Sequence, residues 1–474
     1  MSIFYKPPDA VAADFIPFFW EGRCHLFYLK DYRDRDKHGE GTPWFHLVTD
    51  DFVAFEDWGE ALPRGGDGDQ DLYVFTGSAI ARANEFHIFY TGHNPHFARV
   101  GRENEAVMHA VSSDLRTWRK DPGFRLTAPA QEGYEPHDWR DPFVFWNAEA
   151  GEYWMLLAAR KGTGPARQRG LTALMASPDL ARWELREPFW APDLYYTHEC
   201  PDLFRCGDWW YLVYSTFSER HITHYRMSRD LRGPWLAPAD DGFDGRPVYA
   251  AKTASDGNRR LLFGWLATRT GEKDDGGWNW GGNLVVHELS QESDGTLTTH
   301  PVASILEQFG EALPLEPRPV LGAWRVDGAT ITGGEVGRGA SLLLADLPPC
   351  CLVEAECSFA AGTTNAGLLL RADDALDRYY MLRIEPDRQR IVFDRWPRPG
   401  DQAFMIERPL PMAPETPVRF LVLIDDTCIV AYVNNRIALS CRMHDHRAGK
   451  LGLFVNEGKA HFNRVAIRPR KRTD

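Results

Sequence analysis

Short apolar runs, each preceded by a turn signal, recur five times in the first two thirds of the chain. They are rich in aromatic and branched residues and are bounded by glycine or asparagine, a pattern typical of strands. Convincing long helical periodicity is absent from residues 1–300, so this part of the chain is predicted to be all-β. The five runs are 24–28, 86–90, 153–157, 209–213 and 260–264.

A second pattern, Ser…Asp-Leu…Trp, recurs in step with these runs at 113–118, 177–183 and 228–235, with a weaker copy at 49–58. Successive tryptophans of the pattern are 60, 65 and 52 residues apart, a period that fits the four strands of one propeller blade. Ser and Asp would stabilise a turn while Leu and Trp pack between blades. Coincidence in an aromatic-rich chain is the alternative, but three near-identical copies argue against it. We predict a five-bladed β-propeller over residues 1–310.

The pattern changes after residue 310. A short helix is predicted near 303–308, and Pro314, Pro317 and Pro319 then mark a linker. Beyond them, apolar alternation with turn punctuation resumes, which predicts a separate β-sandwich over residues 320–474. The expected fold class is therefore all-β, with an N-terminal propeller followed by a C-terminal sandwich. Examples of the alternation are 368–371, 379–384 and 420–424.

The charge balance narrows the possible partners. The chain has 54 Lys and Arg against 67 Asp and Glu, a formal net charge of −13, and an acidic surface repels nucleic acid and anionic lipid. No apolar run approaches the roughly 18 residues of a membrane span. Aromatic residues make up 13% of the chain, including 17 Trp; they suit sugar rings, although most are expected to fill β-sheet cores. A neutral small-molecule substrate fits best.

The chain begins MSIFYKPPDAVAADF, without a basic region followed by an apolar one, so no secretion signal is expected. Its eight cysteines form no CxxC pair and are predicted to be reduced core thiols. These observations favour a cytoplasmic protein, with a leaderless form of a secreted enzyme as the alternative. P-loop, Rossmann, HExxH and zinc-spaced patterns are absent, and we expect no cofactor and no metal. Oligomeric state is not indicated.

Three acidic residues stand in apolar or constrained segments that stability alone does not require. They are Asp14, Asp141 and Glu199. The alternative to a catalytic role is a structural one: a turn cap, a surface ion pair with Arg140, or a turn. Their segments precede the first, third and fourth strand runs, so the innermost strands of three blades would bring them together at the channel mouth. Glycosidic cleavage needs two carboxyl groups with separated pKa values, one ionised and one protonated.

These residues also carry a family resemblance. The segments Arg140-Asp141-Pro142 and Glu199-Cys200-Pro201 match two motifs of glycoside hydrolase family 32, and Asp14 falls where that family has its nucleophile. The chain resembles this invertase, inulinase, levanase and fructan exohydrolase family over almost its whole length. Supporting stretches are 75–79, 244–251, 264–265, 280–289 and 433–434.

The resemblance implies roles for these residues on a small carbohydrate. Asp14 would attack the anomeric carbon, and Glu199 would protonate the leaving oxygen and later deprotonate water. Asp141 and Arg140 would hold fructosyl hydroxyls and stabilise the transition state. Plain blade packing is the alternative for the remaining candidates. These expected pocket-wall and hydroxyl-binding residues are Trp44, Phe75, Thr76, Asp244 and Trp265.

Departures from the family pattern surround the expected pocket and put the substrate in doubt. Ala13 stands where the family has Asn, and Leu29 where it has Gln; His198, Lys252 and His287 also differ. The substrate could be an unusual fructoside, a difructose anhydride or another furanoside. Hydrolysis is expected first. Fructosyl transfer, an inverting furanosidase and a non-catalytic sugar-binding propeller are the rival readings.

Overall fold

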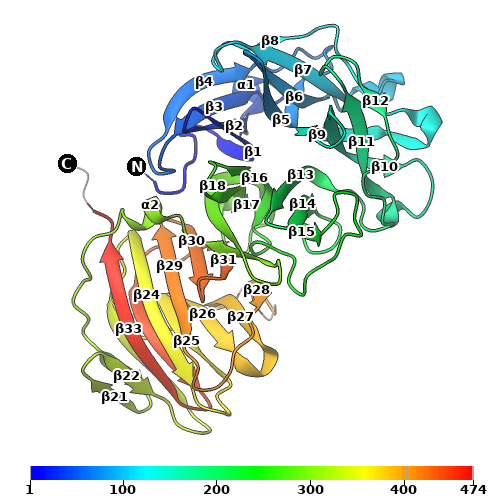
Figure 1. Ribbon diagram of the computed structural model, residues 1–474. Helices are drawn as coiled ribbons and strands as arrows, with labels where there is room; N and C mark the ends of the chain where they lie inside the picture. The colour runs from blue at the N-terminus through cyan, green and yellow to red at the C-terminus, as the bar shows by residue number, and fades with distance from the viewer. Residues whose placement is uncertain (1, 399, 402–403, 472–474) are drawn as a thin grey trace.

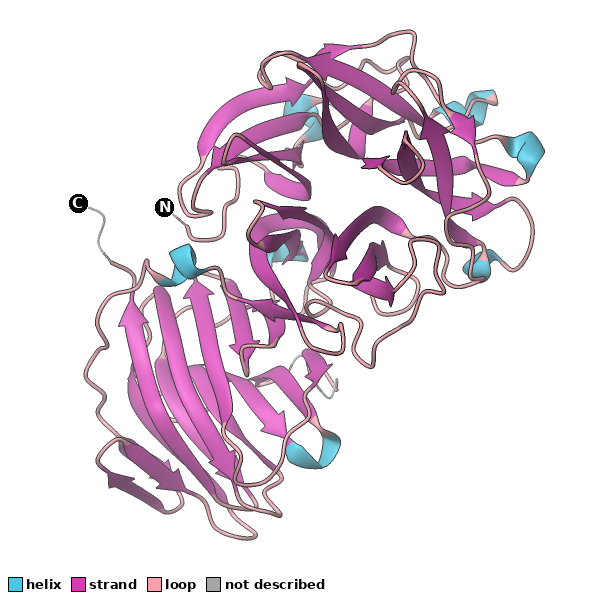
Figure 2. Ribbon diagram, viewed as in Figure 1, coloured by secondary structure: helices cyan, strands magenta, loops and turns pink. Residues whose placement is uncertain are grey.

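The computed structural model describes residues 2–398, 400–401 and 404–471, and this part of the chain is nearly all β (Figures 1 and 2). Its two α-helices, α1 (Arg35–His38) and α2 (Ala303–Leu306), have four residues each. The second confirms the short helix predicted near 303–308. Among the described residues, no helix has the length and hydropathy of a membrane span.

Five antiparallel meanders follow one another through the first 300 residues (Figure 1). Each predicted apolar run lies in the second strand of its meander. The strands are β1 (Val11–Trp20), β2 (Arg23–Asp31), β3 (Trp44–Thr49) and β4 (Glu56–Leu62); β5 (Tyr73–Arg82), β6 (Glu85–His93), β7 (Glu105–Ser112) and β8 (Arg119–Lys120); β9 (Tyr134–Asn147), β10 (Glu152–Lys161), β11 (Gly170–Ser177) and β12 (Glu184–Leu185); β13 (Glu199–Cys206), β14 (Trp209–Thr216) and β15 (Ile222–Ser228); β16 (Val248–Ser255), β17 (Arg260–Arg269), β18 (Trp278–Gln291) and β19 (Leu297–His300).

The first strands of the meanders form a closed ring of contacts. β1 contacts β5, β5 contacts β9, β9 contacts β13, and β13 contacts β16, which returns to β1. The ring closes where the two ends of this region meet, because Ala12 of β1 pairs with Gly282 of β18 and so joins the first and fifth meanders into one sheet. Side chains on these inner strands can therefore converge from distant parts of the sequence.

The Ser…Asp-Leu…Trp pattern is a repeated turn. In its second copy Asp179 Oδ1 accepts backbone N–H groups of two following residues, Leu180 has φ +65°, and the Trp183 indole donates to the Leu180 carbonyl at 3.1 Å. The tryptophan thus caps the turn that precedes it. In the first full copy the hydroxyl that binds Asp114 comes from Ser112 and not from Ser113, because Ser112 ends β7 and borders the turn.

Two seven-stranded antiparallel sheets follow and share one apolar core that includes Val353, Leu368 and Val422. Pro319 does not lie in a linker. It lies within an edge strand, a position in which its missing N–H costs no ladder bond. The first sheet is β20 (Arg318–Leu321), β23 (Gly339–Asp346), β32 (Lys450–Asn456), β25 (Asn365–Ala372), β26 (Tyr379–Glu385), β27 (Arg390–Trp396) and β28 (Ile406–Pro409). The second is β21 (Trp324–Asp327), β22 (Thr330–Gly333), β33 (Ala460–Pro469), β24 (Cys350–Phe359), β29 (Val418–Asp425), β30 (Cys428–Val433) and β31 (Ile437–Arg442).

Candidate active site

Each of the three predicted carboxylates lies at or beside an irregularity in the first strand of its meander. The β1–β2 register shifts between Ala13 and Ile16, and the corresponding shifts in β9 and β13 surround Asp141 and follow Glu199. Backbone φ is +41° at Asp14 and +58° at Asp141, a conformation that side-chain-bearing residues rarely adopt. Such bulges re-aim side chains and are common beside active sites. Here they accompany three acids that share one cavity.

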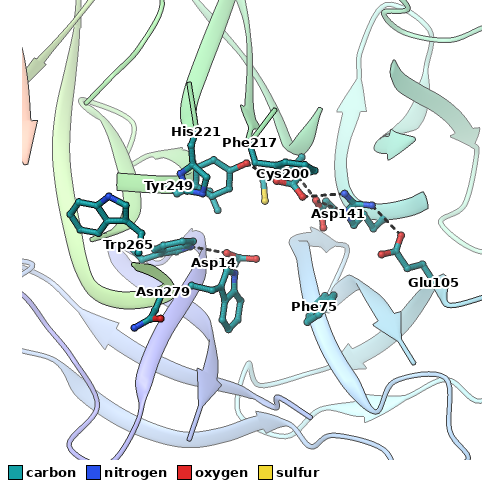
Figure 3. Close-up of a pocket in the computed structure, with 15 residues that line it drawn as sticks. Asp14, Phe75, Glu105, Asp141, Cys200, Phe217, His221, Tyr249, Trp265 and Asn279 are labelled. Atoms are coloured by element: carbon teal, nitrogen blue, oxygen red, sulfur yellow. Dashed lines mark hydrogen bonds and ion pairs between the residues drawn. The ribbon is translucent and has the colours of Figure 1, made fainter. Parts of the chain in front are cut away.

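The cavity has a volume of about 490 Å³ and is lined by all three carboxylates (Figure 3). Arg140, Phe75 and Trp265 also line it, as predicted from the family resemblance. The remaining lining residues were not singled out as site residues from sequence. They are Glu105, Cys200, Phe217, His221, Tyr249, Ala250, Trp278, Asn279 and Trp280.

Asp14 is held by two neutral donors. Thr76 Oγ1 donates to Oδ2 at 2.5 Å, and the Trp265 indole donates to Oδ1 at 2.8 Å. The pKa of Asp14 is raised to about 7, chiefly by burial; the nearby carboxylates of Asp141 and Glu199 add to the rise, and the two donors oppose it. An oriented carboxylate with no cation bound to it suits a nucleophile that must approach an electron-poor carbon.

Glu199 has a different environment. Arg140 Nη2 donates to Oε1 at 3.1 Å, and the Tyr249 hydroxyl donates to Oε2 at 2.6 Å. Burial raises the pKa of Glu199 above its ordinary value, while Arg140 and Tyr249 partly oppose that rise. A carboxyl group with a raised pKa can hold the proton that a leaving oxygen needs.

Asp141 is the most enclosed of the three. The backbone N–H of Cys200 donates to its Oδ2 at 2.9 Å, and its own N–H donates to Thr91 Oγ1 at 2.8 Å. Burial raises its pKa, and Arg140, whose Nε lies 3.8 Å from Oδ2, acts against this rise. Within the described residues no hydrogen bond reaches Oδ1, so this oxygen can accept from a sugar hydroxyl.

Arg140 is the cation that the surrounding acids share. Besides Glu199 and Asp141, its guanidinium contacts Asp138 at 2.5 Å and Glu105 at 3.3 Å. Glu105 also accepts the backbone N–H of Trp139 at 3.0 Å. Sequence reasoning missed Glu105 because it opens an ordinary strand, β7, and no motif surrounds it.

Three candidate contacts take other positions. Thr76 binds Asp14 and is absent from the residues lining the cavity. Trp44 is fully buried behind the wall, where its indole donates to the carbonyls of Val74 and Phe75 at 3.1 and 3.2 Å. The expectation that Trp44 contacts the sugar is corrected, because these bonds direct its N–H group to the β5 backbone and away from the cavity.

Asp244 also lies away from the cavity. Its carboxylate binds His287 Nε2 at 2.9 Å and the Ser440 hydroxyl at 2.5 Å, at the junction with the C-terminal sheets. The departures at Ala13, Leu29, His198, Lys252 and His287 are all buried and none lines the cavity. They lie behind the wall of the cavity and not on its surface.

Within the described residues no group of three or more His, Cys, Asp or Glu is arranged to hold a metal ion. The chemistry that the arrangement can perform rests on one carboxylate held by neutral donors, a second bound to Arg and Tyr, and a third that faces the same space. This combination provides a nucleophile, a proton donor and a stabilising charge.

Comparison with known proteins agrees with this geometry. Residues 15–301 match the model of the glycosyl hydrolases family 32 N-terminal domain, and residues 335–469 match that of the family 32 C-terminal region. The chain belongs to glycosyl hydrolase family 32. Its relatives include raffinose invertase of Escherichia coli, which is 28% identical over 321 residues, a match that covers 63% of each chain and so less than two thirds of that relative's length.

Two further relatives of this family 32 chain match along more of its length. Levanbiose-producing levanase of Bacillus subtilis is 23% identical over 485 residues, covering 95% of this chain and 87% of that one. The structure of exo-inulinase from Aspergillus awamori superposes with a TM-score of 0.77 at 17% identity and covers 99% of both chains. The second likeness shows that the two proteins share a fold.

Proposed function

We propose that the chain is a retaining glycoside hydrolase that cleaves β-fructofuranosides through a covalent fructosyl-enzyme. The observation that carries the proposal is a contrast between two carboxyl groups. Within the part of the chain that the structure describes, Asp14 is bound by Thr76 and Trp265, whereas Glu199 is bound by Arg140 and Tyr249. Raffinose invertase, levanase and exo-inulinase among its relatives support a fructoside as the substrate.

The reaction would proceed in two displacements. Asp14 attacks the anomeric carbon while Glu199 gives its proton to the departing oxygen, which forms the fructosyl-enzyme. Glu199, now ionised, then takes a proton from water as that water attacks the same carbon and releases Asp14. Asp141 accepts hydrogen bonds from fructosyl hydroxyls and stabilises the positive charge of the transition state. Two inversions return the original anomeric configuration.

The same proposal includes the architecture. The closed ring of first strands supports a five-bladed β-propeller over residues 1–310. The two C-terminal sheets with their shared core support a β-sandwich over 320–474. In such a propeller the inner strands of blades one, three and four bring the three acids to the channel mouth.

The proposed substrates are short fructosides, with action in the cytoplasm and without a cofactor. A cavity of about 490 Å³ is of a size for a small ligand and is lined on several sides by aromatic rings. The net charge of −13 supports a neutral partner rather than nucleic acid or a membrane.

One assay tests the proposal. The protein is incubated with sucrose, kestose, inulin, levan and difructose anhydrides, and free fructose is measured. Release of fructose from the short substrates supports hydrolysis. Oligosaccharides longer than the starting sugar at high sugar concentration would indicate transfer. If the protein turns over no fructoside but still binds fructose, it is a sugar-binding protein and the proposed hydrolase activity is wrong.

A further inference from the structure

One wall of the cavity is formed by the first residues of β18, directly after the connection from β17. Trp278, Asn279 and Trp280, at the start of β18, line the cavity, and the Trp280 ring packs edge-on against Trp265. Trp278 packs against both the N-terminal core and the C-terminal core. This wall therefore lies where the two halves of the molecule meet, and the connection that precedes it, 270–277, carries an acidic residue turned away from the cavity.

That residue, Asp274, is bound in a socket formed by the C-terminal sheets. Its side chain is 0% exposed. The Tyr380 hydroxyl donates to Oδ2 at 2.5 Å and Arg395 Nη1 lies 3.1 Å from the same oxygen, while the His444 N–H donates to Oδ1 at 2.8 Å. A buried carboxylate is stable only when it is paired and hydrogen-bonded, and here every one of these partners comes from the C-terminal half.

The position of Asp274 is transmitted to the wall through Arg269. Arg269 Nη1 donates to the backbone carbonyl of Asp274 and, at 3.2 Å, to that of Gly276. The same guanidinium lies 3.7 Å from the centre of the Trp278 ring. A second link runs from Thr270 Oγ1 to Asn279 Oδ1 at 3.0 Å. The anchored turn and the wall are thus connected by one side chain that touches both.

We infer that Asp274 is a positioning residue through which the C-terminal sheets set the cavity wall of Trp278, Asn279 and Trp280. It touches none of the three carboxylates. Loosening the anchor therefore affects how well the substrate is held more than it affects the chemical steps. The kinetic part of this inference rests on the proposed fructosidase function; the structural part does not.

The test uses two variants of the full-length protein that each lose one hydroxyl. Tyr380→Phe removes the 2.5 Å bond to Asp274, and with it the bonds that the hydroxyl accepts from the Asp445 and His446 N–H groups at 3.1 and 3.2 Å. Ser440→Ala is the matched control, because it removes a 2.5 Å bond to Asp244, another buried carboxylate at the same junction that lies outside the 270–277 connection. Steady-state kinetics on sucrose and hydrogen–deuterium exchange of peptides covering 270–282 are measured for both variants, together with the melting temperature.

Tyr380→Phe is expected to raise KM for sucrose about five- to thirtyfold, the equivalent of one lost hydrogen bond, with kcat nearly unchanged. Exchange in 270–282 should rise in this variant alone. Equal behaviour of the two variants, or unchanged exchange in 270–282, would overturn the inference by reducing Tyr380 to an ordinary stabilising contact. If the wild-type protein cleaves no fructoside, the proposed function fails, and the exchange comparison still decides whether Asp274 anchors the wall.

Discussion

The Tyr249 hydroxyl donates a 2.6 Å hydrogen bond to Oε2 of Glu199, the oxygen that Arg140 does not bind. This bond stabilises the ionised form of Glu199 and therefore lowers its pKa against the rise that burial causes. An acid catalyst loses activity as the pH rises through its pKa. If Glu199 is the proton donor, as proposed above, Tyr249 helps to set the upper pH limit of the reaction.

Tyr249→Phe should move the alkaline limb of the pH dependence of kcat/KM to higher pH by roughly one unit, the equivalent of one hydrogen bond to a charged group. The measurement is kcat/KM for sucrose from pH 4 to 9. A limb that stays in place while kcat falls would show that Tyr249 contacts the sugar without tuning Glu199.

Glu105→Gln should move the same limb in the opposite direction. Glu105 lies 3.3 Å from Arg140 and shares its charge. Without that negative charge Arg140 acts more fully on Glu199, 3.1 Å away, and lowers its pKa. Both variants should be measured in one buffer series. A general loss of structure cannot shift the alkaline limb to higher pH in one variant and to lower pH in the other.

Glu199→Gln should lower turnover of sucrose by roughly 10²–10⁴-fold, the usual contribution of general acid–base catalysis. The loss should be much smaller for an aryl fructoside whose leaving group needs no proton. Turnover of both substrates by the wild type and the variant provides the test. If both substrates lose activity equally, Glu199 is not the proton donor.

Asp14→Asn should abolish turnover and make the protein more stable at neutral and alkaline pH. The pKa of Asp14 is raised from 3.8 to about 7, so its contribution to stability is complete below about pH 4 and is lost as the pH rises through 7. The amide does not ionise. The variant should therefore gain on the order of 1–4 kcal/mol above pH 7, and the gain should fade towards pH 4.

Urea unfolding at pH 4, 6 and 8 measures this difference. Asp208→Asn is the control, because the side chain of Asp208 is 83% exposed and should show no such pH dependence. A stability difference for Asp14→Asn that is the same at all three pH values would mean that the Asp14 carboxyl carries no raised pKa.

The first product should keep the anomeric configuration of the substrate. Retaining enzymes hold their two carboxyl groups about 5–5.5 Å apart, which leaves no room for a water between Asp14 and the sugar, whereas inverting enzymes separate them by about 6.5–9.5 Å. Proton NMR during the first minutes of hydrolysis, before the fructose equilibrates, reads the configuration directly. Inversion would make Asp14 a base that acts on water.

Much of the fold could be predicted from sequence because the composition of a strand and the turn residues at its ends are local signals. The runs at 24–28 and 209–213 have the composition and turn boundaries of strands, and both lie in second strands of meanders. The three acids could be found because motifs and unusual local settings surround them. Their convergence could be predicted because the inner strands of a propeller surround one central channel.

What sequence could not supply depends on tertiary contacts. Trp44 matches a family position, yet its environment is decided by the carbonyls of Val74 and Phe75 thirty residues away. Glu105 and His221 line the cavity without any local signal. Asp274 looks like one more acid in a polar loop, and only the C-terminal socket distinguishes it from the acids around it.

The pairing of Ala12 with Gly282 also bears on how the protein is made. Asp14 lies two residues beyond Ala12, on a strand that leaves the ribosome before the fifth meander and pairs with it only later. At about 5–20 residues per second, the interval is roughly 15–55 s. During it β1 lacks its partner in β18, and an unpaired strand edge can associate with other chains. The cavity around Asp14 is therefore complete only after the fifth meander has emerged.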